Sequence, residues 1–397
     1  MRVGFEGSAY MEPTTGVGQY VRALWHEFAR GVPGVEPVML LPGPRADWPT
    51  LPPGEIIALE PPRRFAAGKA RKLWWEQFGL PEAVRRSKAD LVHVPYHSAP
   101  LRRDRPYVVT IHDLVPLVFP VYMNTRRMRL YYRLACRLAP RADLILTDSE
   151  HSAADLQRYL GVPRERIRAI PLAANADYRP LPPTDPTILA ARARYGLDGP
   201  FIFNVGGLDV RKNLVALVQA FALARPHLPA GMRLVIAGAA HSDHPARYPA
   251  LAPVVAAAGL GDCTVLTGRI SDEEKLALLN AADLYVYPSR YEGFGISPLE
   301  AMSCGTPVIC SDQSSLPEVV GDGGLLVEPT PHKLGAAMVQ AMRTPHERPA
   351  WRRRALARAA QFSWASTARL TAAAYEEATR NAARGAWPGR RAVCGAK

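Results

Sequence analysis

Short runs of consecutive apolar residues alternate along the chain with longer stretches in which apolar positions recur every three or four residues. The short runs are typical of strands buried in a parallel sheet, and the longer stretches are typical of amphipathic helices that cover such a sheet. Repeated βαβ units of this kind predict an α/β fold built on doubly wound parallel sheets.

The predicted strands fall into two groups, separated by a proline-rich segment. Those of the first half are Arg2 to Gly7, Pro37 to Leu41, Glu55 to Leu59, Asp90 to Val94, Tyr107 to Asp113, Asp143 to Ser149 and Ile167 to Leu172. Those of the second half are Phe201 to Gly207, Arg233 to Gly238, Cys263 to Gly268, Leu284 to Ser289, Pro307 to Asp312 and Gly324 to Pro329. Helical patterns such as GQYVRALWHEFARG and NLVALVQAFALA fill the gaps.

This grouping predicts two Rossmann-like domains. We expect the first over residues 1–178, a linker over 179–200 where no periodic pattern is found, and the second over 201–362. A last helical pattern over 363–384 is expected to cross back onto the first domain, and the tail 385–397 is expected to be disordered. Ligands of doubly wound sheets bind at the carboxyl ends of the strands, so functional residues should follow strands.

The composition adds a preference for anionic partners. The 397 residues, 48% of them apolar, suffice for two hydrophobic cores. With 49 basic and 36 acidic residues the net charge is +13, which favours phosphate, nucleic acid or a membrane surface, although biased use of arginine is the alternative explanation. The five cysteines include no C-x-x-C pair, and no apolar run approaches the ~20 residues of a spanning helix. We therefore expect a cytoplasmic protein.

A glycine turn precedes the first predicted helix. Gly16, Val17 and Gly18 follow the first strand, where glycines let backbone amides approach a phosphate at a helix N-terminus. Val21 occupies the position at which a dinucleotide fingerprint needs a small residue, so a nicotinamide site is disfavoured. The alternative is that the tight turn alone requires the glycines.

A second glycine turn opens the other half of the chain. Gly207 begins the sequence GLDVRKN, which follows the first strand of that half. In it, Arg211 and Lys212 offer a planar fork and a point charge, which suit the two negative charges of a diphosphate. A solvated pair of surface charges is the alternative.

Three histidines are further candidates for ligand contacts. His112, next to Asp113, ends the fifth predicted strand, and a histidine at a strand end can hydrogen-bond a sugar hydroxyl or a leaving group. His93 and His97, in the sequence HVPYHSAP, also follow a strand. For each of them, a core or capping role is the alternative.

The segment YEGFGISPLEAMSCGTPVICSD carries two glutamates on either side of a glycine turn. Ser297, Pro298 and Glu300 fit a capping box at the start of a helix that ends at Gly305, a feature that stabilises a helix by about 1 kcal/mol. A structural role for Glu300 therefore competes with a ligand role. No local structural role is evident for Glu292, which we predict to bind a ligand.

Five motifs occur in one order along the chain: TIHDL, GGLDVRKN, the EGFG turn with Glu-x7-Glu, CGTPV and LPEVVGDGGLLVEP. In this combination the chain resembles family 4 of the retaining glycosyltransferases, which have the GT-B fold. The resemblance extends from Gly16 to about Ala360 and is closest in the second half. It implies that residues 1–178 bind the acceptor and that residues 201–362 bind a nucleoside-diphosphate sugar as donor.

The resemblance also implies roles for individual residues. Arg211 and Lys212 would neutralise the donor diphosphate, Glu292 would bind a hydroxyl of the donor sugar, and His112 would contact the transferred sugar. Glu300 would bind the ribose. The remaining donor contacts would come largely from backbone groups around the phosphates, the sugar and the base: Gly16, Val17, Gly18, Gly207, Arg269, Ile270, Gly293, Phe294, Gly295 and Ile296.

The reaction implied by the resemblance is transfer with retention at the anomeric carbon. The acceptor hydroxyl would attack on the face from which the diphosphate leaves, and the leaving phosphate would take its proton. The family needs no metal and no further cofactor, and the sequence shows no DxD-type pair placed to hold a metal. Positive side chains and helix dipoles would supply the charge instead.

The stretch TIHDLVPLVFP with the following YYRL helix resembles the mannosyltransferase-like branch that builds surface polysaccharides. This implies GDP-mannose as donor, with a UDP-sugar as the alternative, and a saccharide or lipid-linked saccharide as acceptor, for which His93, His97 and Asp113 are candidate contacts. An epimerase or a phosphorylase of the same architecture does not explain the Glu-x7-Glu segment together with Arg211 and Lys212. A nucleic-acid binder would explain the charge, but the chain shows no aromatic-basic recognition motif.

A basic stretch with interleaved apolar residues follows this motif, over residues 126–137. Such a stretch suits contact with anionic lipid head groups, which would place the protein at the inner face of a membrane. The alternative is a helix with a solvated arginine face and a core face.

Overall fold

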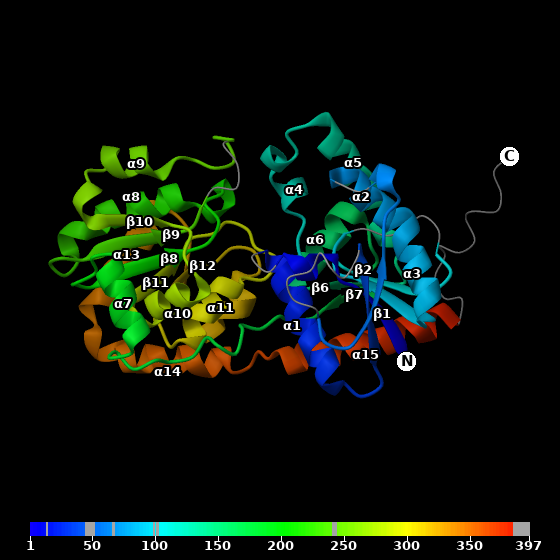
Figure 1. Ribbon diagram of the computed structural model, residues 1–397. Coiled ribbons are helices and arrows are strands. Elements are labelled where there is room, and N and C mark those ends of the chain that lie inside the picture. The colour runs from blue at the N-terminus through cyan, green and yellow to red at the C-terminus, as the bar shows by residue number, and fades with distance from the viewer. Residues whose placement is uncertain are drawn as a thin grey trace. The chain divides into compact units, whose positions relative to one another are not determined.

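The computed structural model describes residues 1–12, 15–43, 52–65, 68–97, 100, 103–239 and 244–383. They form two compact units (Figure 1). Unit 1 comprises Met1–Leu117, Met123–Leu172 and helix α15 (Trp364–Ala383), whereas unit 2 comprises Val118–Tyr122 and Ala173–Ser363. The two units therefore do not follow the order of the chain at two places. Helix α15 comes after unit 2 in the sequence but belongs to unit 1, and the segment Val118–Tyr122 lies within the unit 1 sequence but belongs to unit 2.

Unit 1 is a parallel sheet of seven strands in the order β3-β2-β1-β4-β5-β6-β7. The strands are β1 (Arg2–Glu6), β2 (Glu36–Pro42), β3 (Glu55–Leu59), β4 (Leu91–Val94), β5 (Tyr107–Thr110), β6 (Leu144–Thr147) and β7 (Ile167–Ala169). Its other helices are α1 (Gly16–Gly31), α2 (Gly68–Trp74), α3 (Leu80–Ser87), α4 (Val115–Val118, which ends in unit 2), α5 (Arg126–Leu138) and α6 (Glu150–Leu160). The seven strands predicted for this half are confirmed.

Burial explains why these strands could be predicted from the sequence. Every residue of β4, β5 and β6 is buried, as expected of central parallel strands covered on both faces. Helix α1 buries one face through Tyr20, Val21, Leu24, Trp25 and Phe28, and α15 packs against it.

Unit 2 is a parallel sheet of six strands in the order β10-β9-β8-β11-β12-β13. The strands are β8 (Phe201–Val205), β9 (Arg233–Ala237), β10 (Thr264–Gly268), β11 (Leu284–Tyr287), β12 (Val308–Ser311) and β13 (Leu325–Val327). The helices are α7 (Pro186–Arg194), α8 (Leu214–Ala224), α9 (Leu251–Ala257), α10 (Asp272–Ala281), α11 (Ile296–Ser303), α12 (Leu316–Val320), α13 (Pro331–Arg343) and α14 (Arg348–Ala359). All six predicted strands are confirmed.

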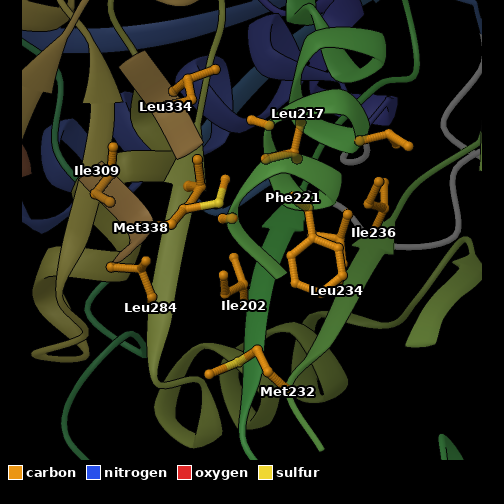
Figure 2. Close-up of a cluster of buried hydrophobic side chains, with 14 of the residues drawn as sticks. Ile202, Leu217, Phe221, Met232, Leu234, Ile236, Leu284, Ile309, Leu334 and Met338 are labelled. Carbon is orange, nitrogen blue, oxygen red and sulfur yellow. The ribbon is translucent and has the colours of Figure 1, made fainter. Parts of the chain in front are cut away.

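One face of the sheet in unit 2 is covered by α8 and α13, whose side chains form a continuous core with the strands (Figure 2). Leu217 and Phe221 of α8 lie with Leu334 and Met338 of α13 over apolar residues of β8, β9, β11 and β12, and all four of these helix side chains are fully buried. This core fixes the carboxyl ends of the strands, from which the loops described below emerge.

The predicted linker over 179–200 is in fact part of unit 2 and contains a helix. Asp185 caps α7 by accepting a hydrogen bond from the amide of Thr187 at 2.9 Å, and Pro186 occupies the first helical turn. Proline is favourable at that position, so the prolines that we took as the sign of a linker instead mark a helix start. The predicted tail 385–397 lies outside the described residues. Among the described helices, none is both long enough and apolar enough to cross a membrane.

Candidate active site

The loop after β8 places two cations at the carboxyl end of that strand. A short 3-10 helix, Val210–Lys212, forms there, and Asn213 ends it in the left-handed conformation, with φ of +58°. The side-chain amide of Asn213 donates to the carbonyls of Pro288, at 3.2 Å, and Pro329, at 2.8 Å. The loop is therefore tied to the loops after β11 and β13, and its cations are held in place.

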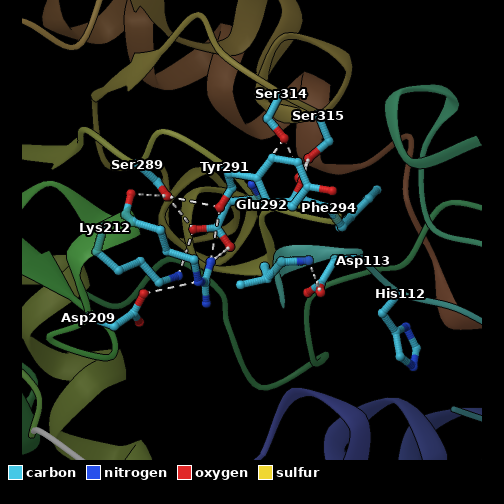
Figure 3. A network of polar contacts seen from close by, with 12 residues as sticks. His112, Asp113, Asp209, Lys212, Ser289, Tyr291, Glu292, Phe294, Ser314 and Ser315 are labelled. Carbon is cyan, nitrogen blue, oxygen red and sulfur yellow. Dashed lines mark hydrogen bonds and ion pairs between the residues drawn. The ribbon is translucent and has the colours of Figure 1, made fainter. Parts of the chain in front are cut away.

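Glu292, in the loop between β11 and α11, is the centre of a buried network (Figure 3). Its Oε1 accepts from Lys212 Nζ at 2.7 Å, from Ser289 Oγ at 2.6 Å and from the Tyr287 hydroxyl at 2.8 Å. Its Oε2 accepts from Arg211 at 2.6 Å. Sequence reasoning found the three charged residues but missed Tyr287 and Ser289, which a search of the strand end before Glu292 would have included.

The electrostatics of this network favour an ionised Glu292. Burial alone raises a carboxyl pKa, but the charges of Arg211 and Lys212 outweigh it and lower the pKa of Glu292 to about 2. Burial, together with Arg211, lowers the pKa of Lys212. The expectation that Glu292 has no local structural role is wrong, because its carboxylate compensates two cations that are largely withdrawn from water.

The EGFG turn that follows Glu292 is clamped by two serines of the loop after β12. Ser314 Oγ accepts from the Glu292 amide at 3.0 Å and lies 2.6 Å from its carbonyl, and Ser315 Oγ donates to the Phe294 carbonyl at 2.7 Å. Gly295 has φ of +110°, and a Cβ atom there would lie 2.7 Å from Leu316. Neither serine was predicted from the sequence, although both follow a predicted strand.

The predicted capping box before α11 is wrong. The helix begins at Ile296, one residue before Ser297, and its N-cap is Gly295 with no side-chain cap. The left-handed turn at Gly295 starts the helix early, so that Ser297 lies inside it. Glu300 is buried and forms an ion pair of 2.5 Å with Lys275 of α10. The predicted helix end is confirmed, because Gly305 follows α11 with φ of +76°.

Two further donor candidates lie at the end of β10, the edge strand of the same sheet. Arg269 is exposed and Ile270 is half-buried, between β10 and the N-terminus of α10. The capping box that was wrong for α11 occurs here instead, because Ser271 accepts from the Glu274 amide at 3.1 Å while Glu274 accepts from the Ser271 amide at 2.8 Å. The backbone of Arg269 and Ile270 is thus followed by a fixed helix start.

In unit 1, His112 follows β5 and is oriented by a buried carboxylate. Its Nδ1 lies 2.8 Å from Asp148 Oδ2, whereas Nε2 is buried and makes no hydrogen bond among the described residues. Burial lowers a histidine pKa, but the Asp148 carboxylate outweighs it and raises the pKa of His112. A histidine oriented by a carboxylate is suited to contact a polar ligand. The neighbouring Asp113 accepts from the Val115 amide at 3.1 Å, which is a local turn contact.

Comparison with known proteins assigns both halves of the chain. Residues 14–178 match the model described as Glycosyltransferase Family 4, and residues 190–358 match the model described as Glycosyl transferases group 1. The O-antigen chain mannosyltransferase B of Escherichia coli is 33% identical over 74% of this chain and 76% of that protein. The chain belongs to glycosyltransferase family 4.

This glycosyltransferase is retaining and has the GT-B fold. The serotype-specific mannosyltransferase WbdA of Escherichia coli is 29% identical over 70% of the chain, which spans about a third, 34%, of the length of WbdA. The sucrose-phosphate synthase of Thermosynechococcus elongatus has a similar fold, with a TM-score of 0.73 and 23% identity over 95% of this chain and 98% of that chain.

The two remaining histidine predictions for this glycosyltransferase have different outcomes. His93 lies inside β4 rather than after it, and its ring nitrogens are 2.7 Å from the Tyr375 and Thr110 hydroxyls. Burial lowers the pKa of His93 to about 3. We took it for a ligand contact, but it is a fully hydrogen-bonded core histidine. His97, by contrast, lines a pocket of about 780 Å³ in unit 1.

In the first glycine turn of this glycosyltransferase, the two glycines differ in what the backbone requires. A Cβ atom on Gly18 would lie 1.9 Å from the Glu12 carbonyl oxygen, and the Gly18 amide donates to Thr15 Oγ1 at 3.0 Å. The turn therefore requires glycine at position 18, and the Gly18 amide is already hydrogen-bonded within the turn. A Cβ atom on Gly16 would meet nothing within 4 Å, so the turn itself does not require that glycine.

Proposed function

We propose that this enzyme transfers mannose from GDP-mannose to a saccharide or lipid-linked saccharide during synthesis of a cell-surface polysaccharide. The single observation that best supports binding of a nucleoside-diphosphate sugar is the cluster of Arg211, Lys212 and Glu292 at the strand ends of unit 2. The names of the relatives support mannose and polysaccharide synthesis. A UDP-sugar is the alternative donor.

The proposed role of the two cations is to bind the diphosphate. Arg211 and Lys212 lie 2.6 and 2.7 Å from the carboxylate of Glu292, which fixes their positions before a ligand arrives. When the bond between the anomeric carbon and the diphosphate breaks, negative charge develops on the leaving oxygen, and preorganised cations stabilise it. The acceptor hydroxyl then bonds to that carbon and its proton passes to the leaving phosphate, so that no protein nucleophile is needed.

The other donor contacts stay as proposed from the sequence, except that of Gly18, whose amide donates to Thr15. The amides at Gly293, Phe294, Gly295 and Ile296 lie before and at the N-terminus of α11, where a helix dipole favours an anion. Glu300 would bind the ribose, Arg269 and Ile270 the base, and Gly16, Val17 and Gly207 the phosphates through their backbone. His112 would contact the transferred sugar through Nε2.

For the acceptor we propose the pocket of unit 1. It is lined by the loop before α1, by the last residues of β2, by α2 and by residues after β4. Arg71 and Lys72 of α2 line it together with Trp75, Tyr96 and His97. Aromatic faces and cations together suit a saccharide that carries an anionic group. His97 therefore remains in the acceptor proposal, whereas His93 leaves it. Asp113 makes a local turn contact.

The exposed face of α5 supports contact with an anionic membrane. Leu130 and Leu134 are 71% and 48% exposed, and Arg129, Arg133 and Arg126 are exposed on the same helix. Exposed apolar residues among arginines suit the head-group region of an anionic bilayer. Vesicles with and without anionic lipid, in a sedimentation assay, test this part of the proposal.

A nucleotide panel tests the donor proposal. We expect GDP to raise the melting temperature of the protein, more than UDP or ADP does, in buffer that contains a chelator. A larger response to UDP would favour the alternative donor. No response to any nucleoside diphosphate would contradict the proposed donor site, and Arg211→Ala, which should lose the response, is the matched variant.

A further inference from the structure

A five-residue segment of the chain lies in unit 2, although the residues before and after it belong to unit 1. This segment, Val118–Tyr122, begins at the last residue of α4 and ends in a 3-10 turn over Pro120–Tyr122. It starts six positions after His112 in the sequence. The proposed function assigns nothing to it.

The segment contacts the loop after β8, which carries Arg211 and Lys212, through the hydroxyl of Tyr122. This hydroxyl donates to Oδ1 of Asp209, whose side chain is buried. The same Oδ1 lies 3.1 Å from Nε of Arg211. Arg211 then donates from its NH1 group to Glu292 at 2.6 Å and to the Tyr291 carbonyl at 3.0 Å. The guanidinium plane is thus held on two sides, by Asp209 and by the loop of Glu292.

Aromatic packing holds two residues of the segment, Tyr122 and Phe119. The guanidinium of Arg247 lies 4.2 Å from the centre of the Tyr122 ring. The ring of Phe119 meets the ring of Tyr291 edge-on, with centroids 6.2 Å apart. One aromatic residue of the segment therefore reaches Arg211 through Asp209, and the other reaches it through Tyr291.

We propose that Tyr122 is a positioning residue for Arg211, acting through Asp209. This inference deepens the proposed function and rests on it. A guanidinium that already has its bound orientation loses less conformational entropy when it forms hydrogen bonds to a phosphate. Removal of the Tyr122 hydroxyl leaves Asp209 with one donor fewer and Arg211 less constrained, so the diphosphate is bound more weakly although every group that touches it is intact.

Tyr122→Phe tests this inference, because it keeps the ring against Arg247 and deletes only the hydroxyl. By calorimetry on the full chain we expect the Kd of GDP to rise about tenfold, which corresponds to ~1.4 kcal/mol. The Kd of guanosine, which has no phosphate, should stay within about twofold of the wild type, since the effect acts on the diphosphate alone. UDP and uridine serve as probes in the same way if the donor proves to be a UDP-sugar.

A matched control is Tyr195→Phe, which deletes a hydroxyl that donates to Glu274 at 3.0 Å, also in unit 2. It should leave the Kd of GDP unchanged. Asp209→Asn should weaken GDP binding as Tyr122→Phe does, and the double variant should cost less than the sum of the two, as expected of residues that act as one unit.

The possible results separate the inference from the proposed function. If Tyr122→Phe binds GDP like the wild type while Arg211→Ala loses binding, the positioning role is wrong and the donor site stands. If Tyr122→Phe weakens GDP and guanosine equally, its role is only structural and the inference is overturned. If Arg211→Ala also binds GDP like the wild type, the donor site itself is wrong.

Discussion

At the scale of single residues, Glu292 shows how a binding group can also be structural. Its carboxylate accepts four hydrogen bonds and compensates Arg211 and Lys212. From the sequence, it was recognised by its place between a strand and a glycine turn. Its structural role could not be seen there, because the two cations that it compensates, Arg211 and Lys212, lie about 80 positions away in the chain.

We predict that Glu292→Ala abolishes transfer and also destabilises the protein. The substitution leaves Lys212 buried without its carboxylate, and an uncompensated buried charge costs about 3 kcal/mol or more. Urea unfolding measures the loss of stability, and Glu328→Ala, at an exposed carboxylate of the same unit, is the control that should change neither property. A Glu292→Ala variant as stable as the wild type would show that the network carries no net stability.

His93 provides a prediction of pH dependence. Its pKa is lowered by burial to about 3, below the value of about 6.5 in an unfolded chain. The unfolded state therefore binds protons first, so the stability due to neutral His93 is complete above about pH 6.5 and is lost as the pH falls toward 3, by up to ~1.4 kcal/mol per pH unit.

His93→Phe removes this titration. We expect the free energy of unfolding of the wild type to decrease more steeply than that of the variant between pH 6.5 and pH 4, in urea titrations at several pH values. The variant should be less stable at pH 7, because the Tyr375 and Thr110 hydroxyls lose their hydrogen bonds to the imidazole. Parallel curves for the two proteins would contradict a neutral buried His93.

At the scale of elements, the sequence predicts a helix or strand correctly where the residues of that element alone determine it. All strands were predicted, because a strand buried on both faces is a continuous apolar run wherever it pairs. Helix α7 was missed because proline at a helix start and proline in a linker look alike without the cap of Asp185. The start of α11 was misplaced because the conformation of Gly295 depends on Leu316, a contact that no local pattern contains.

The clamp between the loop after β12 and the EGFG turn gives a prediction for Ser315→Ala. The variant leaves the Phe294 carbonyl without its 2.7 Å hydrogen bond, and an unpaired buried acceptor costs about 1–3 kcal/mol. We expect a lower melting temperature and weaker GDP binding, since the turn loses its fixed geometry.

Ser303→Ala is the control for the clamp, because the Ser303 hydroxyl donates within α11 to the Leu299 carbonyl at 2.9 Å. It should leave GDP binding unchanged. If Ser315→Ala lowers stability but binds GDP normally, the clamp stabilises the fold without shaping the donor site.

At the scale of the whole molecule, chain order and spatial units differ. The two domains were predicted as consecutive segments with only the helix over 363–384 returning to the first, yet Val118–Tyr122 also leaves the order of the chain and lies in unit 2. No hydrophobic pattern predicts that the segment belongs to unit 2, because five residues are too few to show a periodicity. Its membership of unit 2 rests on tertiary contacts alone, namely Tyr122 with Asp209 and Phe119 with Tyr291.

Hydrogen exchange tests this division of the chain. On addition of GDP, we expect slower exchange in peptides covering 206–213 and 289–296, which carry the proposed donor contacts, and in the amide of Tyr122, which donates to the Phe119 carbonyl at 3.0 Å. Ligand binding raises the free energy of the local opening that exchange requires. Peptides of α6 in unit 1 should exchange as before. Protection of 206–213 without any change at Tyr122 would mean that the segment opens independently of the donor loop, and a segment that opens independently cannot hold Arg211 in place.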